Sequence, residues 1–447
     1  MRMSGLKREL GLGYATLFGV GLILGAGIYV LIGRAAGIVG DAVWASVAFS
    51  GLIAVSTAFS FAELAGMFPY ASSTHRYVAE AVPGRQVLAF LAGWLLFFGG
   101  VAGAATAALG FAGYFCRLTG LTSSVPPALA LLALLSALNW WGIKESASLS
   151  AVFTVIESMG LLLVIALALV SPARQPNYLE AAPGVNPLVA VMVGAAIFYF
   201  AYTGFEFQPT LSEETKDAER TIPKAIVLAV FVTTLLYLAV SLSVVRLMSW
   251  EDLGASKAPL ADAASVAWAG AYGLLMAIAL FATTNTVLGF LVSASRLVYG
   301  LAEEGVVWEG FGRVDSWRRT PHVSVLFSGL LAVLLILLTY YLPEVTGWRL
   351  RFGGFEYQLI DLVGKTSSLS VLLVFLLVNS SLIALRVRRP EAPRPFRVPL
   401  SVGRVPVLPL LANVLILVFL AVSFADWIVW FSTGLVVLLG LLMHKRG

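Results

Sequence analysis

Long apolar stretches, separated by short polar segments, dominate the pattern of hydrophobic and polar residues along this chain. Each approaches the roughly 20 residues that a helix needs to cross a bilayer, and the pattern predicts twelve transmembrane helices. A membrane β-barrel would instead show alternating segments of about ten residues, so the predicted fold class is an all-α polytopic membrane protein. The spans are expected at about 12–34, 42–66, 87–115, 124–142, 149–171, 187–209, 222–247, 266–298, 321–342, 360–385, 405–424 and 427–443.

Several polar segments are expected outside the spans, among them the following three. Residues 70–86 are predicted to form an interfacial or re-entrant helix, residues 211–223 a hydrophilic loop, and residues 250–269 a short helical lid.

The first span is unusual because it carries four glycines between Gly19 and Gly27. A helix in lipid must satisfy its own backbone hydrogen bonds, and a break is tolerated only where the freed groups line a cavity or are covered by protein. We expect a break at Gly25-Ala26-Gly27. N–H groups freed at the start of the second half-helix would suit an anion such as a carboxylate. The alternative is that these glycines only allow close helix packing.

The sixth span repeats this feature, because Thr203-Gly204 and the carboxylate of Glu206 interrupt its apolar run. Two interrupted helices at spans one and six predict two five-helix repeats of inverted topology, with a site at their interface. The repeats would cover about 11–171 and 187–385, followed by two extra helices at about 405–443. We expect the whole chain, 1–447, to form one integral membrane domain.

The composition agrees with this interpretation, since 59% of the 447 residues are hydrophobic and only 12% are charged. Soluble domains carry about 25% charged residues. Lysines and arginines gather in segments on the side of the N-terminus, which predicts cytoplasmic termini in the cell membrane. These loops account for the net charge of +5, which therefore does not indicate nucleic acid binding. The single cysteine, Cys116, excludes an internal disulfide.

Several short motifs follow one another along the spans. They are Gly25-Ala26-Gly27-Ile28-Tyr29, Gly142-Ile143-Lys144-Glu145-Ser146, Phe200-Ala201-Tyr202-Thr203-Gly204-Phe205-Glu206, Glu213-Glu214 with Asp217 and Arg220-Thr221-Ile222-Pro223, Ser295-Arg296 through Ala302-Glu303-Glu304-Gly305, and Asn379 through Leu385-Arg386 with Arg389-Pro390 and Arg394-Pro395-Phe396-Arg397-Val398-Pro399. In this order they resemble the amino acid–polyamine–organocation superfamily, and the resemblance covers nearly the whole chain. Within that superfamily the chain most resembles the prokaryotic cation-independent amino acid permeases and the cationic amino acid transporter branch.

The resemblance implies a leucine-transporter-type fold and secondary amino acid transport by alternating access, either proton-coupled or by exchange. Half-helix N-termini suit an anion and C-terminal carbonyls suit a cation, so a zwitterion needs no charged side chain. The substrate carboxylate would sit on backbone N–H groups around Gly25, Ala26 and Gly27. Its ammonium would meet backbone groups at Leu24, Phe200, Ala201 and Thr203.

Two residues of the sixth span have implied gating roles. Phe200 holds the position of the family's aromatic gate over the substrate, with plain helix packing as the alternative. Glu206 is expected to act in gating as a conformational or structural contact, and a helix-capping carboxylate is the other interpretation.

Glu157 is the clearest ionisable residue inside a span, and such a residue is by default a functional hypothesis. Many relatives have a lysine here that stands in for a sodium ion and is implicated in proton coupling, so the glutamate is a departure from the family. We expect Glu157 to carry the coupled proton. The alternatives are a paired structural carboxylate and a ligand for a metal cation. Lys365 is expected near the outer end of span ten, where it either snorkels to the interface or lines the outer vestibule. Glu63 is expected near the inner end of span two, where it either snorkels or pairs with a cytoplasmic arginine.

The third span has no acidic residue and is small and apolar over residues 99–106, so a neutral amino acid is favoured as substrate. The eighth span offers polar candidates for the site, which are Thr283, Thr284, Asn285 and Ser293.

The chain shows no nucleotide-binding loop, metal motif or nucleophile–base pair, so we expect no cofactor and no enzymatic activity. The expected partners are a small amino acid, a proton as coupling ion and the lipid bilayer. The alternatives are transport of a polyamine or other organic amine, and amino acid sensing without transport on the same fold.

Overall fold

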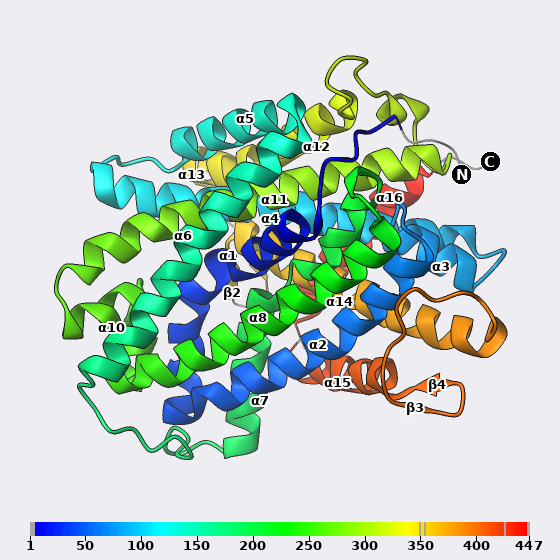
Figure 1. Cartoon of the computed structure of the whole chain (residues 1–447). Helices are drawn as coiled ribbons and strands as arrows, with labels where there is room; N and C mark the ends of the chain where they lie inside the picture. The colour runs from blue at the N-terminus through cyan, green and yellow to red at the C-terminus, as the bar shows by residue number, and fades with distance from the viewer. Residues whose placement is uncertain (1–4, 348–349, 353–354, 424–425, 445–447) are drawn as a thin grey trace.

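A computed structural model describes residues 5–347, 350–352, 355–423 and 426–444, and these are helical almost throughout (Figure 1). Short 3₁₀ or π segments are η1 (Gly40–Ala42), η2 (Phe200–Tyr202), η3 (Phe205–Glu214), η4 (Glu309–Gly312) and η5 (Leu337–Tyr341), and the strands are β1 (Leu350–Phe352), β2 (Phe355–Tyr357), β3 (Ser401–Val402) and β4 (Val405–Pro406). The α-helices are α1 (Leu12–Val39), α2 (Val43–Met67), α3 (Thr74–Ala81), α4 (Gln86–Thr119), α5 (Val125–Trp141), α6 (Ile143–Val170), α7 (Pro187–Tyr199), α8 (Ala218–Leu247), α9 (Trp250–Ala255), α10 (Pro259–Ala267), α11 (Ala271–Glu303), α12 (His322–Ile336), α13 (Leu342–Thr346), α14 (Leu359–Arg388), α15 (Val407–Ser423) and α16 (Trp427–Met443).

These helices follow the predicted spans closely. In the part of the chain that the structure describes, eight segments are long and apolar enough to cross a membrane, and the first of them, Leu12–Met67, joins α1 to α2 through η1. Three shorter apolar helices, α5, α15 and α16, also coincide with predicted spans. The architecture is that of a multi-pass helical membrane protein.

Some boundaries differ from the expectation. α6 begins at Ile143 rather than near residue 149, because the chain turns between α5 and α6 at the single extended residue Gly142. The expectation of a solvated loop over 211–223 is wrong, because η3 reaches Glu214 and α8 begins at Ala218. Glu214 is buried there and pairs with Arg296 at 3.0 Å, so its charge is satisfied inside the protein rather than by water.

Two short antiparallel hairpins are the exceptions to an all-helical chain. β1 pairs with β2 between α13 and α14, and β3 pairs with β4 between α14 and α15. The expected lid over 250–269 folds as the two helices α9 and α10, and the expected polar helix within 70–86 is α3.

α1 runs through the middle of the molecule and is surrounded by other helices (Figure 1). It packs against α6, α8 and α11, while α2 lies along α8 and α4 along α11. A break in α1 is therefore covered by protein, which is the condition under which a membrane helix tolerates one.

Candidate binding site at two interrupted helices

α1 is interrupted at Gly25, where the sequence predicts a break. The backbone angles of Gly25 are φ 28° and ψ −157°, outside the helical region, with helix on both sides. A positive φ favours glycine because no Cβ clashes with the neighbouring backbone. Such a break leaves the first N–H groups of the following half-helix without partners from the preceding turn.

The second interruption separates α7 from η3. After η2 the chain is extended at Thr203 and turns at Gly204, whose φ is 136°. Glu206 is buried, and its Oε2 accepts a hydrogen bond from Gly204 N at 2.7 Å. Glu206 thus reaches back from the first turn of η3 to the N–H of the N-cap residue, as the acidic side chain of a capping box does.

The two interruptions lie in direct contact with each other. A Cβ placed on Gly27 would lie 2.8 Å from the Cα of Ala201. One placed on Gly204 would lie 2.9 Å from the carbonyl carbon of Leu22. Only glycine allows backbones to approach this closely. Gly27 and Gly204 therefore let α1 and the sixth span pack backbone against backbone at their interruptions.

A cavity of about 190 Å³ opens at this junction, against α4 and α11. Five of the predicted substrate residues line it, whereas Leu24 is buried behind it; the Ala26 side chain lies outside the described residues. None of the described lining residues is ionisable. They are Leu22, Ile23, Gly25, Gly27, Val30, Leu31, Gly103, Thr106, Ala107, Gly110, Phe200, Ala201, Thr203, Thr286 and Phe290.

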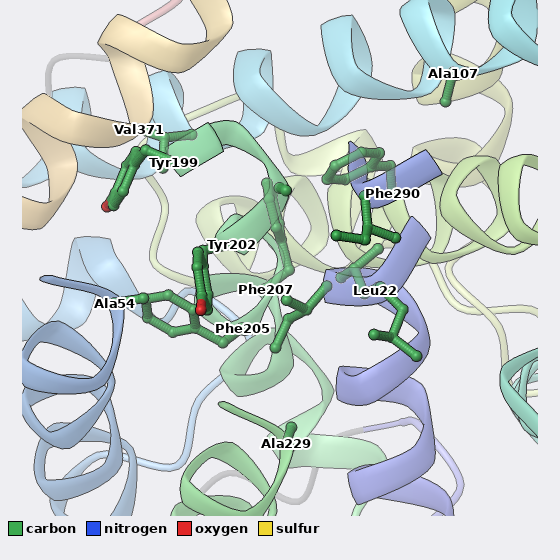
Figure 2. Close-up of a cluster of buried hydrophobic side chains, with 14 of the residues drawn as sticks. Leu22, Ala54, Ala107, Tyr199, Tyr202, Phe205, Phe207, Ala229, Phe290 and Val371 are labelled. Carbon is green, nitrogen blue, oxygen red and sulfur yellow. The ribbon is translucent and has the colours of Figure 1, made fainter. Parts of the chain in front are cut away.

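Aromatic packing closes one side of the cavity. Figure 2 shows Leu22 and Phe290 beside Phe207, which belongs to η3. The rings of Phe207 and Phe290 meet edge to face, with centroids 5.3 Å apart. This contact connects α11 to the segment that follows the second interruption.

Tyr237 of α8 bridges both interruptions, and the sequence analysis did not identify it. Its hydroxyl lies 2.6 Å from Ile23 O, 3.2 Å from Leu24 O and 3.0 Å from Ala201 O. Thr203 Oγ1 donates in turn to Phe200 O at 2.8 Å. Three of the four backbone carbonyls predicted to meet an ammonium, those of Leu24, Phe200 and Ala201, thus accept hydrogen bonds from side-chain hydroxyls.

Glu157 lies beside α1 on the side facing α6 and α11, and not among the residues that line the cavity. Its Oε1 accepts from Asn285 Nδ2 at 2.8 Å, and the same nitrogen lies 3.0 Å from Thr154 Oγ1. Tyr29 OH donates to the backbone oxygen of Glu157 at 3.1 Å. Within the described residues, Glu157 Oε2 and Asn285 Oδ1 accept no hydrogen bond.

The polar residues of α11 that contact the cavity or Glu157 are only partly the candidates that the sequence offered. Asn285 was among the candidates, and it contacts Glu157. Thr286, which was not a candidate, lines the cavity, while Thr283 and Thr284 donate to backbone oxygens of their own helix. Thr154 was also missed, because a threonine in an apolar span gives no signal in the sequence.

Glu63 and Lys365, the other charged residues that the sequence analysis placed near span ends, are not among the residues that line the cavity. Glu63 is buried and paired, as one of its interpretations predicted, with Arg386 Nε at 2.7 Å and Arg394 Nε at 2.9 Å. Lys365 is more than half exposed, and its Nζ lies 3.9 Å from Asp426 Oδ2.

Comparison with known proteins shows the family of this chain. Residues 15–446 match the family model described as amino acid permease. The chain is 27% identical to the branched-chain amino acid permease BcaP of Bacillus subtilis (strain 168), over 97% of this chain and 92% of that protein. It is 26% identical to a methylthioribose transporter of the same organism (98% and 94%) and 28% identical to cationic amino acid transporter 4 of Mus musculus (87% and 61%). The chain therefore belongs to the amino acid permease family of the amino acid–polyamine–organocation superfamily, and it is a transporter rather than an enzyme.

Proposed function

We propose that this chain carries neutral, mainly apolar amino acids across the cell membrane by alternating access. The observation that carries the proposal is the cavity at the two interruptions, whose described walls offer backbone groups and small side chains but no charge. The substrate carboxylate would lie on the N–H groups that follow Gly25. Its ammonium would lie near the carbonyls of Leu24, Phe200 and Ala201. Both ends of a zwitterion are then held by helix termini.

The side-chain end of the substrate would face α4 and α11. Gly103, Ala107 and Phe290 form an apolar wall there, with Thr106 as a weakly polar neighbour. A volume of about 190 Å³ lies below the roughly 300–1,000 Å³ of pockets for drug-sized ligands, which favours a small substrate. The name of the relative BcaP, a branched-chain amino acid permease, supports an aliphatic side chain.

Coupling is assigned to Glu157. A buried carboxylate is costly unless a proton or a cation neutralises it, and Glu157 has no ion-pair partner among the described residues. Its contacts with Asn285 and Tyr29 connect α6 to α11 and α1. Binding or loss of a proton at Glu157 would change these contacts and so the packing of α6 and α11 against the interrupted part of α1. A paired structural role and a cation-ligand role are the competing assignments.

The proposal includes a full topology. The chain would cross the membrane twelve times, with repeats of about 11–171 and 187–385 in inverted orientation and two further helices over about 405–443. The excess of lysine and arginine on the N-terminal side supports cytoplasmic termini. Phe200, which lines the cavity, would close over the substrate, and Glu206 would support that segment as a cap.

Uptake by the purified protein in liposomes tests this proposal. Labelled leucine, isoleucine and valine should enter faster than lysine or arginine, and an inward proton gradient should raise accumulation above the level reached without one. A competition panel should include putrescine and methylthioribose, since a polyamine substrate and the substrate named for one relative are the alternatives. Preferred uptake of lysine, arginine or putrescine would contradict the neutral cavity.

Glu157→Gln tests the coupling assignment in the same liposomes. The variant keeps the hydrogen-bonding shape of the side chain but cannot exchange a proton at neutral pH. We expect gradient-driven accumulation to disappear, while exchange of labelled for unlabelled leucine continues. Full accumulation by the variant would exclude Glu157 as the proton carrier. Retained binding of leucine without any uptake by the wild-type protein would favour the sensor alternative.

A further inference from the structure

A groove on the perimeter of the molecule lies apart from the substrate cavity, where the last turns of α6 and α8 meet the first turn of α2. Its volume is about 590 Å³. Leu169 and Leu242, on its rim, are 66% and 37% exposed, so the groove opens toward the lipid. It is lined by Trp44, Ile165, Ala168, Leu169, Tyr178, Ala239, Leu242, Ser243 and Arg246.

Arg246 is the only charged residue in this lining. Among the described residues, its guanidinium forms no hydrogen bond and no ion pair. The neighbouring Arg174 differs, because it is paired with Asp41 at 3.2 Å. An uncompensated positive charge therefore stands at one end of an otherwise uncharged groove.

The loop between α6 and α7 is fixed over this charged end. Trp44 Nε1 donates to Tyr178 O at 2.8 Å, and Tyr178 OH donates to Leu242 O at 3.3 Å. The backbone N–H of Arg174 donates to Arg246 O at 2.8 Å. Tryptophan and tyrosine are enriched at the level of lipid headgroups because one side of the ring is apolar and the other polar.

The length of the groove fits one leaflet. Its walls use residues 165–169 of α6 and 239–246 of α8, which span roughly 10 Å along a helix axis. The hydrocarbon core is about 30 Å thick, so the groove reaches partway through one leaflet. A partner transmembrane helix would instead pack along the whole depth, usually on small residues.

We propose that this groove binds an anionic phospholipid, with an acyl chain along the apolar walls and the phosphate at Arg246. The guanidinium matches a phosphate in charge and hydrogen-bonding geometry. Phosphatidylglycerol keeps its net negative charge, whereas the ammonium of phosphatidylethanolamine already compensates its phosphate. The site therefore prefers phosphatidylglycerol.

Native mass spectrometry of the purified chain in mixed micelles containing equal amounts of the two lipids tests the proposal. The wild-type protein should retain phosphatidylglycerol in preference to phosphatidylethanolamine. Arg246→Gln should weaken this retention about five-fold, the contribution of one basic residue near an anionic surface. Arg117→Gln, at an exposed arginine that ends α4, is the control and should retain the lipid like the wild type.

A second pair of variants tests the groove itself. Ala239→Trp fills the groove and should abolish retention, whereas Leu235→Trp, one turn earlier on α8 at a 52% exposed position, should not. Equal retention of the two lipids, or wild-type retention by Arg246→Gln, would overturn the proposal. If Ala239→Trp does not fold, the Arg246→Gln result decides alone, because the Arg246 guanidinium forms no hydrogen bond or ion pair with the described protein.

Discussion

Tyr237 places one hydroxyl within hydrogen-bonding distance of three backbone oxygens, two in α1 and one in η2. One O–H donates to one acceptor at a time, so these carbonyls share a single proton. Each carbonyl oxygen has two lone pairs, and the ammonium of the proposed substrate would bring three donors to the same cluster. The Tyr237 hydroxyl therefore holds these carbonyls in place and leaves some of their lone pairs free for the ammonium of the proposed substrate.

Tyr237→Phe should weaken both folding and substrate binding. Loss of the hydroxyl leaves buried carbonyls without a donor, which lowers the free energy of unfolding by about 1–3 kcal/mol. The carbonyls are then less well placed, and we expect the KM for leucine to rise about ten-fold, equivalent to about 1.4 kcal/mol. Thermal unfolding in detergent and uptake kinetics in liposomes measure the two effects.

Tyr202→Phe is the matched control for this change. Tyr202 is buried beside Tyr237, and its hydroxyl donates to Val47 O at 3.3 Å, away from both interruptions. It should lose stability to a similar degree and keep the wild-type KM. An equal rise in KM in both variants would mean that Tyr237 acts through general packing.

These residues differ in how far the sequence could predict them. Gly25 and Gly204 were predictable, because two glycine-containing interruptions in apolar spans have few uses in a membrane. Tyr237 was not, because an aromatic residue in a span is ordinarily a packing residue, and its partners lie 36 to 214 positions away. Thr154 and Thr286 were missed because the pattern along a span does not show which of its threonines faces another helix or the cavity.

At the scale of elements, η3, α11, α5 and the N-terminal segment are joined around Glu214. Arg296 Nε and Nη2 lie 3.0 and 3.1 Å from the Glu214 carboxylate, and Arg296 also contacts Asn139 of α5. The backbone N–H groups of Glu9 and Leu10 donate to Glu214 O at 2.9 and 3.0 Å. This junction lies at the end of the molecule where α1 begins.

The pattern of charge could not predict this junction. Residues 211–223 contain several acidic and basic residues close together, which is typical of a solvated loop. Only the fold shows that the partner of Glu214 lies 82 positions away on α11. A buried pair of this kind requires tertiary contacts that no local window contains.

Replacing the Glu214–Arg296 pair should open this end without unfolding the protein. Removing one partner strands a buried charge and costs about 3–5 kcal/mol, whereas apolar replacement of both is often neutral. We expect Glu214→Gln to be strongly destabilised and Glu214→Leu with Arg296→Met to melt near the wild-type temperature. In a Cys116→Ser background, a Ser293→Cys thiol on α11 should react faster with maleimide in the double variant.

The matching control breaks an ion pair at the opposite end. Asp41→Asn with Arg174→Gln removes the contact between η1 and the loop after α6. It should leave the reactivity of the thiol at position 293 unchanged. Unchanged reactivity in the Glu214–Arg296 double variant as well would show that this pair does not control access from that end.

At the scale of the whole molecule, the positions of the helices were predictable because lipid forces backbone hydrogen bonds inside each segment. The packing between them was not predictable. Nothing in the pattern places α1 between α6, α8 and α11, or brings Trp94 Nε1 of α4 to within 2.8 Å of Val436 O in α16. Orientation in the membrane is a property of the whole chain, and it rests on the distribution of lysine and arginine.

Thiol labelling tests this orientation directly, because Cys116 is the only cysteine in the chain. Cys116→Ser therefore gives a background without thiols. Leu121→Cys, 53% exposed between α4 and α5, should react with a membrane-impermeant maleimide on intact cells. Trp317→Cys, 81% exposed between η4 and α12, should react only after the cells are permeabilised, because an odd number of predicted spans separates the two sites. The reverse pattern would invert the topology, and labelling of both positions on intact cells would contradict a single orientation.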